Sequence, residues 1–218
     1  ILRVVIFKSN YAFYLLCYYV VLKNNIFMTL LGESVTDASV LAVKTHEHNL
    51  NSKFKFNKVI LIVRDPFEAL QAEFNRQSGG HIGHASANSY KRQGGKHWKS
   101  FVLNGATKWE HTNLYWYNSF PHPSTHHVIF YENLIQDTEN TLRKLLDFLN
   151  IDITEDQMKC AMTHKEGMYH RSKKKVVGVQ LFDVKMRQTI NDVKERVYAV
   201  LKNTTDIPLL SSTIGPNL

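Results

Sequence analysis

The strongest constraint on the fold is a repeated pattern, in which a short apolar run is followed by polar residues and then by an amphipathic segment. The run "VILIV" at 59–63 is continuous and rich in β-branched residues, which is typical of a strand covered on both faces. The run "VIFY" at 128–131 is similar. Strands that alternate with helices predict an α/β fold with a parallel sheet flanked by helices.

Helix-capping signals follow both runs. Asp65 is a good N-cap, Pro66 suits the first helical position, and Glu68 stands where a capping box has its acidic residue. Asp137 can begin the helix after the second run, and Asn150 can end it. The expected apolar faces of these helices are Phe67, Leu70 and Phe74, and then Leu142, Leu145, Leu146 and Leu149.

Other segments predict further elements. The segment 77–98, "QSGGHIGHASANSYKRQGGKHW", shows no periodicity and is rich in Gly, Ser and His, which predicts a long, mobile loop or lid. Thr154 and Gln157 can open a helix as a capping box. Core positions are expected at Trp109, Trp116 and Phe120, and in a last helix at Ile190, Val193, Val197 and Leu201.

The composition predicts that the binding partner is negatively charged. The chain of 218 residues suits one domain, and its net charge of +8 predicts attraction to phosphate, sulfate, nucleic acid or an acidic membrane face. The two cysteines, Cys17 and Cys160, match neither a metal framework nor a disulfide scaffold, so free thiols are expected. The sequence carries no signal for an oligomeric state.

The N-terminal segment is atypical. The uncharged run at 9–22 is shorter than the roughly 20 apolar residues that cross a bilayer, so a buried helix or strand pair is favoured over a membrane anchor. Because the chain begins at Ile1 rather than at a methionine, a fragment or a displaced gene-model boundary is expected.

Titratable residues follow a third apolar run, "VLAV" at 40–43. Strand alternation places Lys44 and His46 on the same side. Histidine titrates near neutral pH and can accept a proton from an attacking hydroxyl, while lysine can neutralise a departing phosphate or sulfonate oxygen. The alternative is a histidine that caps the end of a strand.

Arg64 ends the second strand, so its guanidinium and the first helical N–H groups could share one anion. The alternative is a local pair with Asp65 or Glu68. The basic turn "HRSKKK" at 170–175 is either a solvated loop or a phosphate clamp. His81, His84 and His97 lack a carboxylate or cysteine at ligand spacing, so no metal is expected.

Four segments in order, "VLAVKTH", "VILIVRDPFEALQAEFNRQSGGHIGHAS", "VIFYENLIQDTENTLRKLLDFLNI" and "GMYHRSKKK", resemble the sulfotransferases, in particular the WSC-domain-containing group. The likeness runs from about Gly32 to about Lys202. It implies a P-loop-type three-layer fold with a central, mostly parallel sheet. It also implies transfer of a sulfonate from 3′-phosphoadenosine 5′-phosphosulfate to a hydroxyl, often on a carbohydrate.

The resemblance also implies residue roles and a location. His46 would be the base, and Lys44 would contact the phosphosulfate. Arg64 would hold the 3′-phosphate, with Arg171, Lys173 and Lys174 closing over it. The WSC-domain group further implies a glycan acceptor and a type II Golgi membrane protein whose catalytic domain is lumenal. The expected divisions are an atypical segment at 1–31, a sulfotransferase-like domain at 32–205 and a tail at 206–218.

Two departures from the sulfotransferase pattern leave other functions open. Ala72 stands where many sulfotransferases have a serine that binds the 3′-phosphate, and no glycine-rich phosphosulfate loop precedes Lys44. The segment 4–13, "VVIFKSNYAF", lacks glycine and lies too close to Lys44 to be that loop. One alternative is therefore a non-catalytic sulfotransferase-fold protein that binds a partner. A nucleic-acid-binding protein is disfavoured, because the cations gather at strand ends and in one loop.

Overall fold

A computed structural model describes residues 3–7, 42–45, 56–80, 82–163, 165, 178 and 180–201, the first two ranges as backbone only. The described elements are β1 (Arg3–Phe7), β2 (Ala42–Thr45), β3 (Lys58–Val63), α2 (Pro66–Gly79), α3 (Ala87–Lys91), the 3-10 helix η2 (Arg92–Gly95), α4 (Lys96–Ser119), β4 (His126–Phe130), α5 (Tyr131–Gln136), α6 (Thr138–Leu149), α7 (Glu155–Thr163) and α8 (Val184–Leu201).

The described strands form one sheet in the order β2-β1-β3-β4. Strand β3 pairs with β4 in parallel, whereas β1 is antiparallel to both of its neighbours, β2 and β3. Strands β2, β3 and β4 therefore run in the same direction, and their carboxyl ends lie at one edge of the sheet. The predicted mostly parallel α/β sheet is confirmed, with β1 as the exception.

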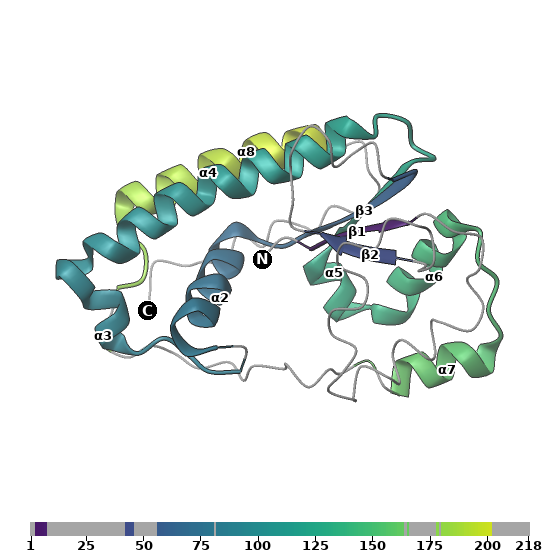
Figure 1. Cartoon of the computed structure of the whole chain (residues 1–218), viewed down its shortest axis with the longest axis horizontal. Helices are drawn as coiled ribbons and strands as arrows, with labels where there is room; N and C mark the ends of the chain where they lie inside the picture. Colours follow the sequence, from purple (N-terminus) through teal and green to yellow (C-terminus); the bar gives the residue numbers. More distant parts are fainter. Residues whose placement is uncertain are drawn as a thin grey trace.

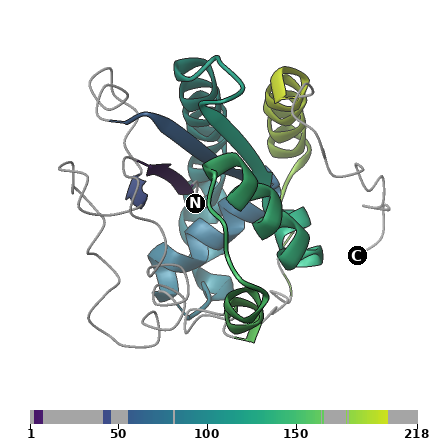
Figure 2. The same ribbon diagram turned by 90° about the vertical axis from the view of Figure 1, so that its right-hand side faces the viewer.

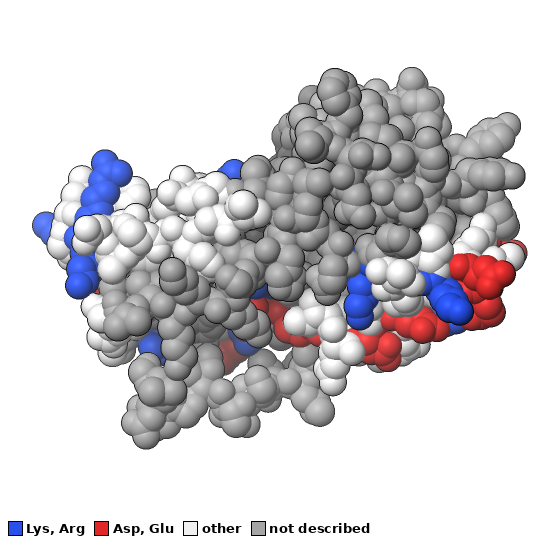
Figure 3. Space-filling model, turned by 90° about the horizontal axis from the view of Figure 1, so that it is seen from below, with Lys and Arg blue, Asp and Glu red and all other residues white. Residues whose placement is uncertain are grey.

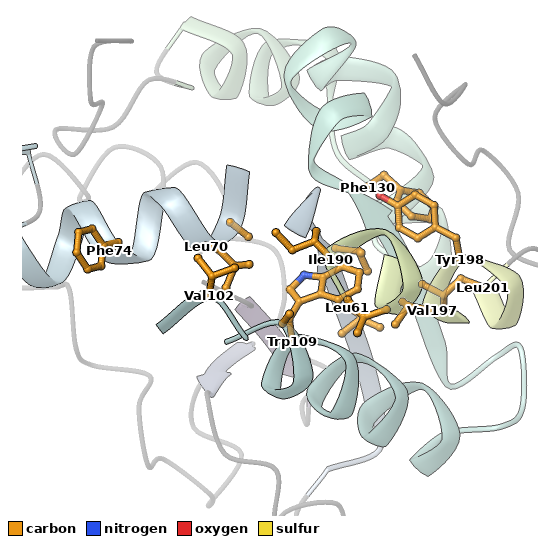
Figure 4. Close-up of a cluster of buried hydrophobic side chains, with 14 of the residues drawn as sticks. Leu61, Leu70, Phe74, Val102, Trp109, Phe130, Ile190, Val197, Tyr198 and Leu201 are labelled. Carbon is orange, nitrogen blue, oxygen red and sulfur yellow. The ribbon is translucent and has the colours of Figure 1, made fainter. Parts of the chain in front are cut away.

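Helices cover both faces of the sheet (Figure 1). Side chains of β3 alternate between two apolar clusters, because successive residues of a strand point to opposite faces. Val59, Leu61 and Val63 pack in the main core with side chains of α2, α4 and α8. Figure 4 shows Leu61 close to Trp109 of α4 and Ile190 of α8. Ile60 packs on the opposite face with residues of α5 and α6. Figure 2 shows α4 and α8 lying next to each other.

The helix boundaries confirm most of the capping signals. Asp137 accepts a hydrogen bond from the N–H of Asn140, and Asn150 ends α6 in the left-handed conformation with φ 54°. Thr154 and Gln157 form the reciprocal pair that the sequence predicts, with hydrogen bonds of 2.8 and 3.3 Å. The predicted core residues Trp109, Trp116, Phe120, Ile190, Val193, Val197 and Leu201 are buried.

The segment 77–98 is largely helical, so the prediction of a loop or lid is wrong for most of its length. It contains the end of α2, all of α3 and η2, and the start of α4. Ser86 caps α3 by accepting the N–H of Ser89 at 3.2 Å. The buried Asn75 holds the segment against α2, since its side-chain oxygen accepts the N–H of Ala85 at 2.9 Å.

Cys160 on α7 is disulfide-bonded, so the expectation of free thiols is wrong. Cys17, the uncharged run at 9–22 and the tail at 206–218 lie outside the described residues. None of the helices in the described ranges combines the length and the hydrophobicity of a membrane span.

Replacing Asn75 with Ala tests how the segment 77–98 is held. The substitution removes the oxygen that accepts the buried N–H of Ala85 and the hydroxyl of Tyr90, which costs about 1–3 kcal/mol. We expect chemical denaturation to report a free energy of unfolding lower by that amount. Asn104→Ala, at an exposed position of α4, is the control and should cost less than about 0.5 kcal/mol. Equal losses in the two variants would contradict this account.

Candidate functional site

Three helices contact the turn that follows β3. Arg64 and Asp65 form this turn, and we call it the Arg64 turn. The indole N–H of Trp109 on α4 donates to the backbone oxygen of Arg64 at 3.2 Å. The carboxylate of Glu132 on α5 accepts the N–H of Asp65 at 2.9 Å. Lys194 on α8 donates to the carboxylate of Asp65 at 2.6 Å. The turn is therefore held from both of the helical layers.

The side chain of Arg64 lies between an aromatic ring and a carboxylate. Its guanidinium carbon is 4.6 Å from the ring centroid of Tyr131, and its Nη2 donates to Oε2 of Glu68 at 2.9 Å. The Nε–H is buried and has no hydrogen-bond partner among the described residues. A buried donor without a partner is unusual in proteins and suggests a missing acceptor. An anion would supply that acceptor.

The start of α2 departs from the capping box that the sequence predicts. Asp65 is the N-cap and accepts the N–H groups of Phe67 and Glu68 at 2.9 and 3.4 Å. The N–H of Asp65 itself goes to Glu132 rather than to Glu68. Glu68 instead pairs with Arg64, which is one of the local alternatives that the sequence left open.

The prediction that Arg64 and the first N–H groups of α2 share one anion is therefore wrong for the observed capping of α2. Asp65 already occupies the N–H groups of Phe67 and Glu68, and Pro66 has no N–H. The guanidinium of Arg64 is left as the group of this turn that can bind an anion.

A set of carboxylates lies behind the Arg64 turn. Oε2 of Glu132 is buried and has no partner in the described part of the chain. Burial raises the pKa of Tyr198, and the nearby carboxylates of Glu132 and Asp65 raise it further. The ammonium group of Lys194 lies 5.6 Å from the centroid of the Tyr198 ring. Lys194 therefore provides positive charge next to this acidic cluster.

Sequence reasoning missed Glu132, Lys194 and Tyr198. Glu132 is the second residue after β4, so its place near the carboxyl edge of the sheet was a usable signal. Lys194 stands 129 residues after its partner Asp65, and nothing in the local helix pattern distinguishes it from a solvated lysine.

Lys44 lies on β2, two strands away from β3. The register aligns Lys44 with Val5 and Val5 with Ile60, four residues before Arg64. The backbones of Lys44 and Arg64 are therefore separated by roughly 10 Å across the sheet and roughly 13 Å along it. A ligand that contacts both residues has to span two strands. His46, Arg171, Lys173 and Lys174 lie outside the described residues, and their roles stay predictions.

The direction of β1 determines the edge of the sheet at which this strand ends. Because β1 is antiparallel to β2 and β3, its carboxyl end lies at the edge of the sheet opposite to Arg64. A phosphosulfate loop at the Arg64 edge would follow a strand whose carboxyl end lies at that edge, and the carboxyl end of β1 does not. Residues 8–13 lie outside the described residues. This finding agrees with the rejection of segment 4–13 from its sequence.

Surface charge is unevenly distributed. On the face shown in Figure 3, basic side chains gather at the end formed by α3 and the start of α4, where Lys91, Arg92 and Lys96 are exposed. The opposite end carries mixed charges on α6 and α7, where Arg143 pairs with Glu139 and Glu155. No cluster of three potential metal ligands occurs among the described residues, which do not include His81.

Residues 22–195 match the family model described as the sulfotransferase domain. The chain belongs to this family. Among curated proteins it is similar to "WSCD family member CG9164" of Drosophila melanogaster, at 45% identity over 78% of this chain and 53% of that protein. It is also similar to "WSCD family member AAEL009094" of Aedes aegypti, at 42% identity with the same coverage. The chain thus spans about half the length of these relatives.

The WSCD matches confirm the resemblance inferred from the motifs. Among solved structures, the chain is similar to mouse sulfotransferase SULT7A1 complexed with PAP, at 19% identity and a TM-score of 0.46. That similarity covers 67% of this chain and 59% of the mouse chain.

The raised pKa of Tyr198 predicts how stability depends on alkaline pH. An unfolded tyrosine titrates near pH 10. Because the pKa of Tyr198 is higher in the folded protein, its neutral hydroxyl contributes its full stabilisation of the folded state below about pH 10. This stabilisation is lost as pH rises further. Once the unfolded tyrosine is ionised, the free energy of unfolding should fall by about 1.4 kcal/mol per pH unit relative to Tyr198→Phe. Denaturation of both proteins between pH 8 and 11.5 measures this difference. Parallel plots of unfolding free energy against pH would refute the raised pKa of Tyr198.

Proposed function

We propose that this domain transfers a sulfonate from 3′-phosphoadenosine 5′-phosphosulfate to a hydroxyl of a carbohydrate. Membership in the sulfotransferase family supports sulfonate transfer in general. The observation that carries the donor assignment is Arg64, which stands at the carboxyl edge of the sheet with a buried Nε–H that has no partner among the described residues. Ligands of open α/β sheets bind beyond this edge.

Arg64 would bind the 3′-phosphate of the donor. A guanidinium binds phosphate best through two parallel N–H···O bonds, and Nε with Nη2 offers such a pair. Trp109 fixes the backbone of Arg64, and the Tyr131 ring supports its side chain. The position of the guanidinium is therefore set before the donor arrives. Arg171, Lys173 and Lys174 would add positive charge over the same phosphate.

Transfer itself would be assigned to Lys44 on β2 and to His46, two residues later in the sequence. His46 would take the proton of the acceptor hydroxyl while its oxygen attacks sulfur in line with the bond that breaks. The new oxygen–sulfur bond forms as the bond from sulfur to the bridging phosphate oxygen breaks. The electron pair stays on that oxygen, and Lys44 would neutralise the negative charge that develops there. The products are the sulfated acceptor and 3′-phosphoadenosine 5′-phosphate.

The acceptor and the location follow from the WSC-domain resemblance. This resemblance supports the proposal that the acceptor is a glycan in the Golgi lumen. The net charge of +8 suits anionic ligands, which include the nucleotide donor and acidic glycans.

A second candidate is a sulfotransferase-fold protein that binds a partner without catalysis. The observation that favours it is the antiparallel β1, whose carboxyl end points away from the edge that carries Arg64. Calorimetry with 3′-phosphoadenosine 5′-phosphate separates the two candidates. Absence of binding at millimolar ligand would remove the donor site and leave the partner-binding role.

Arg64→Met tests the donor site. Losing a hydrogen bond between charged partners costs about 1.5–3 kcal/mol, so the Kd for 3′-phosphoadenosine 5′-phosphate should rise at least about tenfold. Calorimetry measures this change. Arg143→Met, which removes an exposed arginine of α6 paired with Glu139 and Glu155, is the matched control and should bind like the parent chain. Unchanged binding by Arg64→Met would contradict the assignment.

His46→Ala tests the proposed base. General bases contribute about 10²–10⁴-fold to rate, so transfer to an oligosaccharide acceptor should fall by at least about 100-fold. The Kd for 3′-phosphoadenosine 5′-phosphate should stay within about twofold, because the base acts on the acceptor. A radiolabelled sulfonate assay measures the rate, and calorimetry measures affinity. A variant that retained most of the activity would rule out this role.

A further inference from the structure

We propose that Glu68 is a built-in competitor for the donor's 3′-phosphate and thereby sets how tightly the nucleotide binds. This inference rests on the proposed function, since it assumes that Arg64 is the phosphate ligand. Oε2 of Glu68 lies 2.9 Å from Nη2 of Arg64, so a negatively charged group already lies against the guanidinium that would bind the phosphate.

The geometry places two anions against one nitrogen. Nη2 has two N–H groups and already donates to Glu68, so a phosphate that binds Nε and Nη2 together would lie beside this carboxylate. Repulsion between the two anions then favours departure of Glu68. The Nε–H has no partner among the described residues in the present arrangement. Glu68 thus accepts a hydrogen bond from one guanidinium nitrogen, whereas a phosphate can accept from two.

The side chain of Glu68 is free to leave. It is 55% exposed, whereas that of Arg64 is 28% exposed, so the carboxylate can turn into water while the guanidinium stays in place. The Tyr131 ring and the Trp109 hydrogen bond hold Arg64 independently of Glu68. Displacement therefore requires movement of one exposed side chain.

Glu68 is not needed to begin α2. Asp65 caps the helix, and Glu132 accepts the N–H of Asp65 that a capping-box glutamate would take. The remaining structural contribution of Glu68 is a partly exposed ion pair four residues apart, and pairs of this kind add little to stability. This leaves an effect on the ligand as its main consequence.

The competitor lowers affinity for both donor and product, because both carry the 3′-phosphate. A bound phosphate would also lie near the displaced carboxylate and be repelled by it. Release of 3′-phosphoadenosine 5′-phosphate after transfer is therefore faster with Glu68 than without it. The carboxylate favours turnover over retention of the product.

Glu68→Gln tests the inference. Removing the charge at constant shape should lower the Kd for 3′-phosphoadenosine 5′-phosphate about three- to fivefold, in line with the strength of an exposed ion pair. The dissociation rate of the same nucleotide should fall by a similar factor. Calorimetry and stopped-flow displacement on the 218-residue chain measure the two quantities.

Two controls separate charge at the site from charge in general. Glu139→Gln removes the glutamate of another Glu–Arg helical pair, on α6, and should leave the Kd unchanged. Adenosine 5′-phosphosulfate lacks the 3′-phosphate, so its affinity should be the same for the parent chain and Glu68→Gln. Equal thermal unfolding midpoints for the two glutamine variants would show that folding is intact.

The outcomes distinguish this inference from the proposed function. If Arg64→Met binds 3′-phosphoadenosine 5′-phosphate as well as the parent chain does, the donor site itself is wrong. If Arg64→Met weakens binding but Glu68→Gln leaves it unchanged or weaker, the donor site stands and the competitor role is overturned. Tighter binding by Glu139→Gln as well would also overturn it, because the effect would then be one of net charge.

Discussion

The carboxylate of Asp65 is the contact on which the functional edge depends. One of its oxygens accepts the first free N–H groups of α2, and the other accepts Lys194 from α8 at 2.6 Å. A group that is only 22% exposed and bonded on both sides fixes the direction in which the chain leaves β3. Arg64, the residue before it, therefore has one backbone position and presents its guanidinium at the edge of the sheet.

Local patterns predicted the elements well, because they depend on neighbours in sequence. The β-branched run gave β3, and capping residues such as Asp137 and Asn150 gave the ends of α6. The segment 77–98 was misjudged because its helices depend on a tertiary contact, the buried Asn75 oxygen on the N–H of Ala85. Its glycines are compatible with helices that end and restart within a few residues.

The candidate site was predicted only in part, for the same physical reason. Arg64 was found because it follows a strand directly, and the carboxyl ends of parallel strands collect ligands. Its environment was not, since Glu132 and Lys194 reach the turn from α5 and α8 over 67 and 129 residues of sequence. The sequence also assigned Glu68 to the helix cap, whereas Glu132 accepts the N–H in question and Glu68 meets the guanidinium instead.

Donor binding in this domain depends on phosphate reaching the Arg64 guanidinium, and NMR of arginine Nε–H groups tests this most directly. An Arg64→Lys variant assigns the Arg64 signal, which should come from a slowly exchanging proton because this Nε is buried. Saturation with 3′-phosphoadenosine 5′-phosphate should move that signal strongly downfield, as a charged hydrogen bond forms. A nucleotide that binds and shifts other signals while leaving the Arg64 Nε–H signal in place would contradict the account.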